Sequence, residues 1–307
     1  MSDIKPKISL GLPVYNESEF LDETILSLIN QTYENIEIIA IDNGSDDNSY
    51  EILEKYSRSD KRIKIFKNDE NIGLSDNFNL TFRKSTGIYF VWIGAHDRYN
   101  RNFVEELLKK ITSSKNISLV FSNVSNIDKN SQVLSHKKNT GFQLLNKNSL
   151  LRLLKLPWVI RGNGDVVMGM FDRDALRKTT LFSSSVLWAD VFLVYQISRL
   201  GKIIRVDEVL RDRRYFRDEE ENFKTWEAKY KKLTSRFRSP REIGNRKPGL
   251  SLYLPVLFMC WKIFYELGIK KFYNPINIIV AIYLITIFIL KRRAALWIDV
   301  KTYFSKS

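Results

Sequence analysis

Four short polar segments carry most of the side chains that could do chemistry in the first hundred residues. Each follows an apolar run, and the four segments are PVYNES (13–18), DNGSDDNS (42–49), NDENIGLSDN (68–77) and GAHDR (94–98). One polar loop after a strand is ordinary turn chemistry. Because ligands bind at the carboxyl ends of strands in open parallel sheets, four such loops meeting at one edge would form a binding site.

The usual glycine-rich phosphate-binding motifs are missing. The chain has no GxGxxG after its first predicted strand and no GxxxxGK[ST] anywhere. A dinucleotide site of the Rossmann type and a P-loop therefore both lack their phosphate cradle. A nucleotide bound at these loops would need carboxylates for its base and ribose, and a divalent cation held by aspartate for its diphosphate.

An alternation of strands and helices is predicted to position these loops. Apolar, β-branched runs predict strands at 7–12, 36–42, 62–68 and 88–93, and helical periodicity predicts helices at 18–31, 46–57 and 74–84. Farther along, we expect helices at 103–112 and 188–200, strands at 117–124, 164–173 and 202–206, and a polar loop or edge hairpin at 132–140. This alternation is typical of an α/β fold with a mostly parallel sheet flanked by helices.

Positive charge is concentrated in the second half of the chain. Residues 1–150 have a net charge of −1 and the remaining residues have +15. Such asymmetry suggests a nucleic acid or an anionic membrane as a partner, and a solvated basic face without a partner is an equal alternative. The single cysteine, Cys260, excludes an intramolecular disulfide and fits a reducing compartment. The charged first 30 residues predict no secretion signal.

The C-terminal region combines basic and apolar segments. Residues 224–247 carry nine basic residues against two acidic ones, and apolar segments follow at 250–268 and 275–290. As a helix, the last segment would be about 24 Å long, short of a hydrocarbon core of roughly 30 Å. It could just span a membrane, lie in the interface or pack as a core helix. The adjacent basic run favours membrane contact.

Several segments together resemble a family 2 glycosyltransferase with the GT-A fold. They are PVYNE (13–17), IDNGSDD (41–47) and NIGLSDNFNLTFRKSTGIYF (71–90), in the order and spacing of the family. LWADVFLVYQISRLGKIIRVDEVL (187–210) is similar to the acidic catalytic position of the family with the helix, glycine and strand that follow it. The resemblance implies a GT-A domain at 1–220, with a Rossmann-like nucleotide-binding half at 1–100 and an acceptor half at 101–220. A basic, apolar helical extension would occupy 221–307.

The resemblance also implies the roles of individual residues. The implied nucleotide-binding residues are Pro13, Tyr15, Asn16, Glu17, Asp42, Asn71 and Gly73. Among them, Asp42 would accept an N–H from the base, and Asn71 and Gly73 would close over the nucleoside. Asp190 would be the general base that takes the proton from an acceptor hydroxyl. The alternative for Asp190 is a helix N-cap.

The segment GAHDR departs from the family pattern. The family has an Asp-x-Asp pair, often with a further Asp, and these positions fall on Gly94, His96 and Asp97. Asp97 is the one carboxylate left, and His96 suits manganese better than magnesium. Three alternatives follow. Asp97 and His96 hold a manganese or magnesium ion, or metal dependence is weakened and Arg213 and Arg214 assist the diphosphate, or the nucleotide binds without turnover.

These features predict an inverting glycosyltransferase with a nucleoside-diphosphate sugar, UDP favoured, as its donor. The acceptor would be a glycan or lipid-linked glycan in cell-surface polysaccharide synthesis, used at the cytoplasmic face of the membrane. Attachment would be peripheral or through a single C-terminal hydrophobic helix. Residues 211–216 would form a flap near the diphosphate or a surface charge cluster. Two other functions are considered: a catalytically silent scaffold that binds sugar nucleotides, and a nucleic-acid-binding protein, for which no motif is visible.

Overall fold

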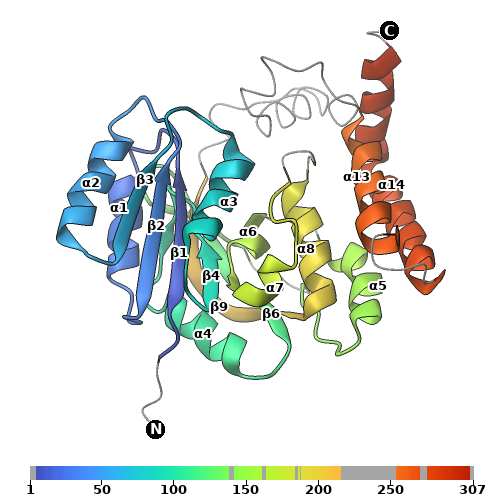
Figure 1. The fold of residues 1–307 in the computed structure, drawn as a ribbon, viewed down its shortest axis with the longest axis horizontal. Coiled ribbons are helices and arrows are strands. Elements are labelled where there is room, and N and C mark those ends of the chain that lie inside the picture. The colour runs from blue at the N-terminus through green and yellow to red at the C-terminus, as the bar shows by residue number, and fades with distance from the viewer. Residues whose placement is uncertain are drawn as a thin grey trace.

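A nine-stranded mixed sheet forms the centre of the fold (Figure 1). The computed structural model describes residues 5–137, 142–160, 164–183, 186, 188–215, 254–269 and 275–304. The strand order is β3-β2-β1-β4-β8-β6-β9-β5, and β7 pairs with β6. Strands β1 to β4 are parallel, β8 runs antiparallel between β4 and β6, and β6 and β9 are parallel. The predicted α/β fold with a mostly parallel sheet is confirmed.

The predicted elements of the first hundred residues are present to within a few residues. The strands are β1 (Ile8–Val14), β2 (Ile36–Asp42), β3 (Ile63–Lys67), β4 (Tyr89–Trp92), β5 (Arg98–Tyr99), β6 (Ile117–Ile127), β7 (Val133–Lys137), β8 (Met170–Asp172) and β9 (Lys202–Arg214). The described helices are α1 (Leu21–Ile29), α2 (Ser49–Ser59), α3 (Leu74–Lys84), α4 (Phe103–Thr112), α5 (Ser149–Val159), α6 (Gly164–Val167), α7 (Arg173–Arg177), α8 (Ala189–Leu200), α13 (Pro255–Ile263), the π-helix η1 (Phe264–Ile269) and α14 (Pro275–Phe304).

Helices cover both faces of the sheet, which explains the continuous apolar runs of β1 and β2. Every residue of these two strands is buried. On one face they pack against α1, α2 and α4. On the other face, the core joins α3 to α5, α8, α13 and α14 around Trp92. Its ring makes edge contacts with the rings of Phe90, Phe171 and Phe182, with centroids 4.7–5.3 Å apart.

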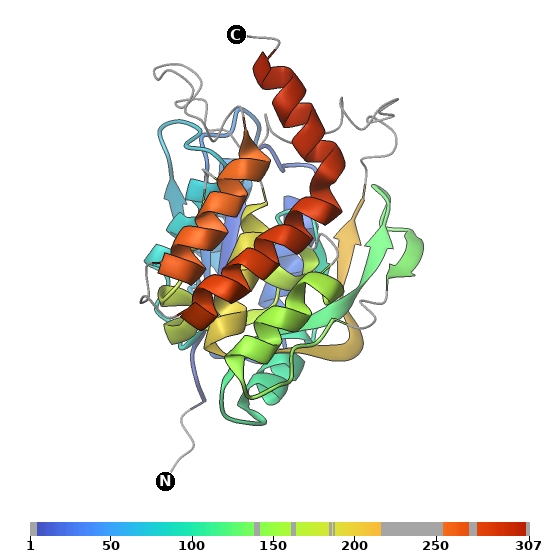
Figure 2. The same ribbon diagram turned by 90° about the vertical axis from the view of Figure 1, so that its right-hand side faces the viewer.

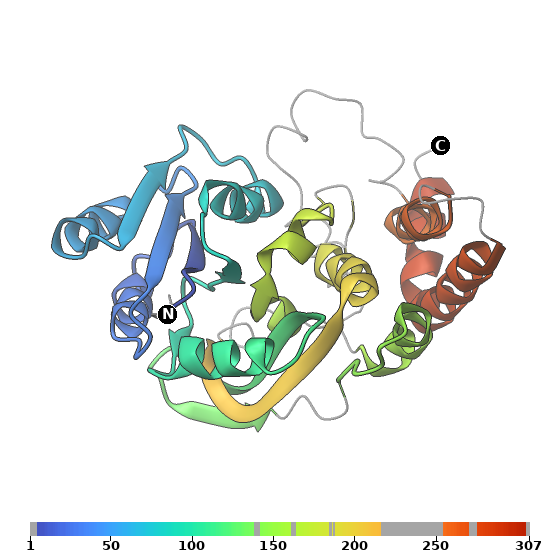
Figure 3. The same ribbon diagram turned by 60° about the horizontal axis from the view of Figure 1, so that its bottom comes forward.

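Three predictions after residue 130 need refinement. The segment 164–173 was expected to be one strand, but its first part is α6 and only Met170–Asp172 forms β8. The break falls near Gly169, where a Cβ would collide with the carbonyl oxygen of Val120. The predicted strand at 202–206 continues to Arg214, so residues 211–214 are part of β9 and neither a flap nor a surface cluster. In Figure 3, β9 curves along β6, where irregular pairing bends the strands. The hairpin expected at 132–140 is the β6–β7 pair.

The C-terminal helices pack against the outside of the second half. Figure 2 shows α13 and α14 side by side in front of α5 and α8. Their inner sides bury residues such as Met259, Ile263, Leu284 and Phe288. None of the helices in the described ranges combines the length and hydropathy that crossing a bilayer requires. The basic run at 224–247 lies outside the described residues.

Candidate active site

The polar segments after β1, β2 and β3 meet at the carboxyl edge of the sheet, as their spacing predicts. The backbone N–H of Asn43 donates to the carbonyl of Val14 over 2.8 Å, and that of Asn68 donates to the carbonyl of Asp42 over 2.9 Å. Beside them, the N–H of Ile93 donates to the carbonyl of Gly11 over 2.9 Å, which brings the loop after β4 to the same edge. The candidate nucleotide-binding residues therefore share one region.

Hydrogen bonds fix the loop after β1 to the loop after β2. The backbone N–H of Asn16 donates to Ser45 Oγ over 3.0 Å, and the Asn16 side-chain oxygen accepts from the backbone N–H of Asp46 over 2.9 Å. Asn16 has a φ of +53°, a left-handed conformation that asparagine tolerates. Within this fixed loop, Pro13 is buried in β1 and the Tyr15 side chain is exposed to solvent.

Asp42 is a fully buried carboxylate with one oxygen in use. Its Oδ2 accepts the backbone N–H of Ser45 over 3.1 Å. Its Oδ1 finds no hydrogen-bond donor among the residues that the structure describes. A buried acceptor without a donor is costly, so such an atom often marks the place of a ligand. The geometry is compatible with the predicted contact between Asp42 and a base N–H.

A network of asparagines organises the loops after β2 and β3. Asn43 donates through Nδ2 to the Asn71 side-chain oxygen over 2.9 Å and accepts from Asn68 Nδ2 over 2.9 Å. The same oxygen of Asn71 accepts the backbone N–H of Gly73 over 2.8 Å, and Gly73 has a φ of +92° that favours glycine. Asn43 and Asn68 were not singled out from the sequence, although Asn43 directly follows one predicted strand and Asn68 is the last residue of another. Closure of Asn71 and Gly73 over a nucleoside stays a prediction.

His96 and Glu17 form a pair at the same edge. His96 Nδ1 lies 2.9 Å from Glu17 Oε1, and both side chains are partly exposed. The backbone N–H of Glu17 donates to Ser49 Oγ over 2.9 Å, which holds the residue in place. Glu17 was expected only in the nucleotide pocket, and its pairing with His96 was not expected because the two residues come from separate loops. Together they offer a carboxylate and an imidazole to a ligand.

Asp97 is buried and belongs to a charged cluster beneath this edge. Its Oδ1 accepts the backbone N–H of Arg214 over 3.1 Å, and its Oδ2 lies 3.7 Å from the Arg211 guanidinium. A Cβ on Gly94 would come within 2.7 Å of Oδ2, so this carboxylate occupies the space that a side chain at position 94 would fill. Arg211 also forms an ion pair with Asp165, which is buried as well. These contacts hold the Asp97 carboxylate in place within the protein.

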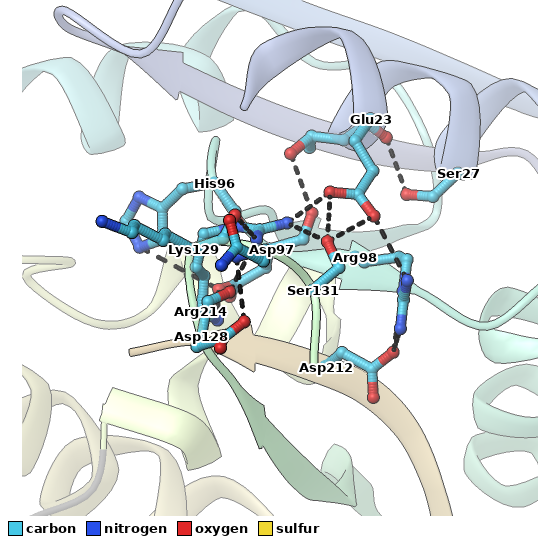
Figure 4. A network of polar contacts seen from close by, with 12 residues as sticks. Glu23, Ser27, His96, Asp97, Arg98, Asp128, Lys129, Ser131, Asp212 and Arg214 are labelled. Atoms are coloured by element: carbon cyan, nitrogen blue, oxygen red, sulfur yellow. Dashed lines mark hydrogen bonds and ion pairs between the residues drawn. The ribbon is translucent and has the colours of Figure 1, made fainter. Parts of the chain in front are cut away.

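Arg214 joins four separate segments of the chain (Figure 4). All five of its N–H donors are used, and the acceptors are the carbonyls of His96, Asp128 and Lys129, the Glu23 carboxylate and the Ser131 hydroxyl. In this structure no guanidinium donor of Arg214 is left for a diphosphate, and the predicted role of Arg214 there stays a prediction. Arg213 is partly exposed and lies 3.3 Å from both carboxylate oxygens of Asp165. Its predicted contact with a diphosphate stays a prediction.

Asp190 lies in the first turn of α8, at the same edge of the sheet as the nucleotide-binding loops. Since α8 ends directly before β9, which runs parallel to β6, its first turn must lie at the carboxyl edge. Burial raises the pKa of Asp190, while backbone hydrogen bonding and the nearby cation of Arg292 act in the opposite direction. The residue at the N-cap is Trp188, so the alternative of Asp190 as the N-cap is wrong. A carboxylate with a raised pKa suits a general base.

The model of the family described as Glycosyl transferase family 2 matches residues 9–179. The chain belongs to this family. An uncharacterized glycosyltransferase of Haemophilus influenzae is 28% identical over 220 residues, which make up 67% of this chain and 64% of that relative. The match includes every predicted nucleotide-binding residue of this family 2 member, while Asp190 lies beyond the residues that the family model matches.

Solved structures share the fold of this family 2 chain. Staphylococcus aureus TarS 1–349 in complex with UDP-GlcNAc has a TM-score of 0.56 at 12% identity, over 96% of this chain and 88% of that one. The mannosyltransferase PcManGT of Pyrobaculum calidifontis, in complex with GDP-Man and Mn²⁺, has a TM-score of 0.54 at 15% identity, over 95% and 76%. These likenesses confirm the GT-A fold that the sequence predicts.

The metal-binding prediction changes with the positions of these side chains. Among the described residues, no three His, Cys, Asp or Glu side chains are grouped to hold a metal ion. A magnesium ion beside a diphosphate, however, commonly takes only one or two protein ligands, and the phosphates and water supply the rest. Glu17 supplies one such carboxylate, and the neighbouring His96 imidazole suits manganese better than magnesium. Arg211 and Arg214 contact the Asp97 carboxylate in this structure, and the role of Asp97 as a metal ligand stays a prediction.

Proposed function

We propose that this family 2 member is an inverting glycosyltransferase that moves a sugar from a nucleoside-diphosphate sugar, UDP favoured, to a hydroxyl of a glycan or lipid-linked glycan. The observation that carries the proposal is the position of two carboxylates at one edge of the sheet. Asp42 Oδ1 has no donor among the described residues, and burial raises the pKa of Asp190 at the start of α8. Asp42 suits recognition of a nucleotide base, and Asp190 suits proton transfer from the acceptor hydroxyl.

The reaction would be a single displacement at the anomeric carbon. The acceptor hydroxyl oxygen forms a bond to that carbon while its proton moves to the Asp190 carboxylate. The bond between the anomeric carbon and the diphosphate oxygen breaks, and the diphosphate leaves with the electron pair. Because the acceptor attacks the face opposite the leaving group, the anomeric configuration inverts. A Mn²⁺ or Mg²⁺ ion held by Glu17 and His96 would offset the charge of the diphosphate.

Replacing Asp42 with asparagine is expected to weaken UDP binding by about tenfold or more, because the bond to a base N–H would lose its charged acceptor. Calorimetric titration with UDP measures the change. Asp46→Asn is the matched control, since Asp46 lies in the same loop with an exposed side chain and loses the same charge. Equal weakening in both variants would mean that only the net charge of the loop matters and would contradict the role given to Asp42.

The pH dependence of transfer should report the environment of Asp190. The base must be ionised, so activity is lost as the pH falls through its pKa. Because burial raises that pKa, the loss should occur at higher pH than for an ordinary aspartate. Arg292→Gln removes a cation that lowers the pKa, so it should move the loss to still higher pH. Measurement of kcat/KM against pH tests this, and an acid limb that is identical in both proteins would contradict it.

We propose that the protein acts at the cytoplasmic face of a membrane. The support is a set of exposed apolar side chains on the C-terminal helices, here called the α13–α14 apolar face: Leu257, Trp261, Tyr265, Ile276, Ile279, Ile282, Leu290 and Trp297. Leu257, Trp261 and Tyr265 recur every fourth residue along α13 and η1, and the Trp261 and Tyr265 rings stack with centroids 5.3 Å apart. Aromatic and apolar groups on one side of a helix are typical of interfacial binding.

Replacing Trp261 with serine is expected to reduce co-sedimentation with vesicles of anionic phospholipid by several-fold, because burial of this ring would no longer favour binding. Leu134→Ser is the control, since Leu134 is also an exposed apolar residue but lies on β7. The proposal predicts that the control sediments like the wild type. Unchanged sedimentation of the Trp261 variant, or an equal loss in the control, would contradict it.

A further inference from the structure

A cavity lies where α5, α8 and α14 meet. Its volume is about 380 Å³, which is within the range of small-ligand sites. The lining residues are Pro157 and Ile160 from the α5 side, Val191 and Tyr195 from α8, and Ile287, Phe288, Lys291 and Arg292 from α14. Most of the wall is apolar, and the two cations lie next to each other in the sequence. The lining therefore suits a ligand with both hydrocarbon and negative charge.

Arg292 is the cation in this cavity that lacks a hydrogen-bonded partner. Its guanidinium lies over the Trp188 ring, 5.1 Å from the centroid, but forms no hydrogen bond or ion pair with any residue that the structure describes. Burial lowers its pKa, so keeping it charged here has a cost. The α14 backbone departs from helical geometry at this residue, with φ −116° and ψ 18°. A partly buried guanidinium whose five donors have no acceptor among the described residues favours an anionic ligand.

Lys291 differs from Arg292 because it already has a partner. Its Nζ donates to the Pro157 carbonyl, and it lies 5.6 Å from the centroid of the Trp158 ring. On the same side, the Trp158 indole N–H donates to the Tyr283 hydroxyl over 2.5 Å. These contacts fasten α14 to α5. They hold the wall of the cavity in place, and Arg292 is the cation that is available to bind a ligand there.

The cavity adjoins the candidate catalytic base. Val191, which lines it, directly follows Asp190 in α8. Arg292, which also lines it, interacts electrostatically with Asp190. A ligand whose negative group contacts Arg292 would thus have its neighbouring atoms near Asp190. Ile282 and Leu290 of the same helix belong to the α13–α14 apolar face.

We propose that this cavity is the acceptor subsite and that it binds a phosphate ester of a hydrocarbon chain. The phosphate contacts Arg292, the first carbons of the chain pack against Ile287 and Phe288, and the sugar hydroxyl attached through the phosphate reaches Asp190. The inference rests on the proposed function, since it names the chemical class of the acceptor. It also gives a reason for the kink of α14, which brings a cation to the cavity wall.

Calorimetric titration of the full chain with octyl phosphate tests the proposal. We expect saturable binding that is about tenfold weaker or more in Arg292→Gln. Arg293→Gln is the matched control because Arg293 is exposed on the same helix, and it should bind like the wild type. Octanol has the chain without the charge and inorganic phosphate has the charge without the chain, so each should bind more weakly than octyl phosphate.

A second pair of variants tests the cavity itself. Ile287→Trp fills the space and should abolish octyl phosphate binding, whereas Thr286→Trp, at an exposed position of the same helix, should not. Titration with UDP is run on every variant. If UDP binds but octyl phosphate does not, or binds equally in Arg292→Gln, the subsite is wrong and the proposed function stands. If octyl phosphate binds through Arg292 but no nucleoside diphosphate binds, the proposed function is wrong and the cavity is not an acceptor subsite.

Discussion

Replacing Asp190 with asparagine is expected to lower sugar transfer by about 10²- to 10⁴-fold, the usual contribution of a general base. The amide has nearly the same shape but cannot take the proton from the acceptor hydroxyl. Because Asp190 is placed on the acceptor side of the reaction, UDP binding should be unchanged. Steady-state transfer rates and calorimetric titration of the same protein samples measure the two effects.

Asp174→Asn is the control for this experiment, because Asp174 is an exposed aspartate on α7 that forms an ion pair with Arg177 at the surface. It should transfer sugar at the wild-type rate. The same experiment addresses the silent-scaffold alternative, which the incomplete Asp-x-Asp pattern suggests. Transfer by the wild type that disappears in Asp190→Asn excludes a silent scaffold, and transfer that persists in the variant contradicts the base assigned here.

The largest expected loss of stability follows the removal of Arg211. Its guanidinium lies between two buried carboxylates, in an ion pair with Asp165 and 3.7 Å from Asp97. Arg211→Ala would leave both carboxylates buried without this cation. Breaking a buried ion pair by removing one partner costs about 3–5 kcal/mol. Urea unfolding, followed by circular dichroism, should show a lower midpoint with a similar slope.

A surface ion pair provides the matched control for Arg211. Arg177 lies 3.6 Å from Asp174, and both side chains are more than half exposed. Arg177→Ala should change the free energy of unfolding by no more than about 1 kcal/mol, as is usual for exposed pairs. An equal, small effect in both variants would mean that water reaches the Asp97–Arg211–Asp165 cluster and that the cluster does not support the site.

The first half of the fold could be predicted because its signals are local. Strands β1 and β2 are apolar runs buried on both faces, β3 combines apolar and basic residues, and the helices between them have a clear apolar side. The end of β9 gave no such signal, since its sequence RDRR is fully charged. Those residues are in a strand because Asp97, Asp165 and Glu23, from three distant parts of the chain, neutralise the arginines.

The site was predictable in its general position but not in its contacts. The order of strands and loops was enough to bring Asp42, Glu17 and His96 to one edge. Side-chain pairing depends on packing, so the sequence could not show that His96 would contact Glu17 while Asp97 would turn to Arg211. The cavity beside Asp190 was also unpredictable, because α5, α8 and α14 are far apart in the sequence.

The charge of the second half does not by itself require a nucleic acid. Arg211 and Arg214 are buried in ion pairs, and Arg292 lies in a cavity beside Asp190. These arginines count toward the net charge but are not arranged as a surface patch for a phosphate backbone. The basic run at 224–247 lies outside the described residues. The described arginines therefore give no support to the nucleic-acid alternative.

Calorimetric titration of the purified protein with UDP, with and without Mn²⁺, tests whether the loops at the carboxyl edge of the sheet bind a nucleotide. We expect saturable binding of one UDP per chain, tighter with Mn²⁺, with the metal-dependent gain lost in His96→Ala because this ring is one of the two proposed ligands. The contradictory result would be no binding of UDP, GDP, dTDP or CDP under either condition. The loops at the carboxyl edge of the sheet would then not form a nucleotide site.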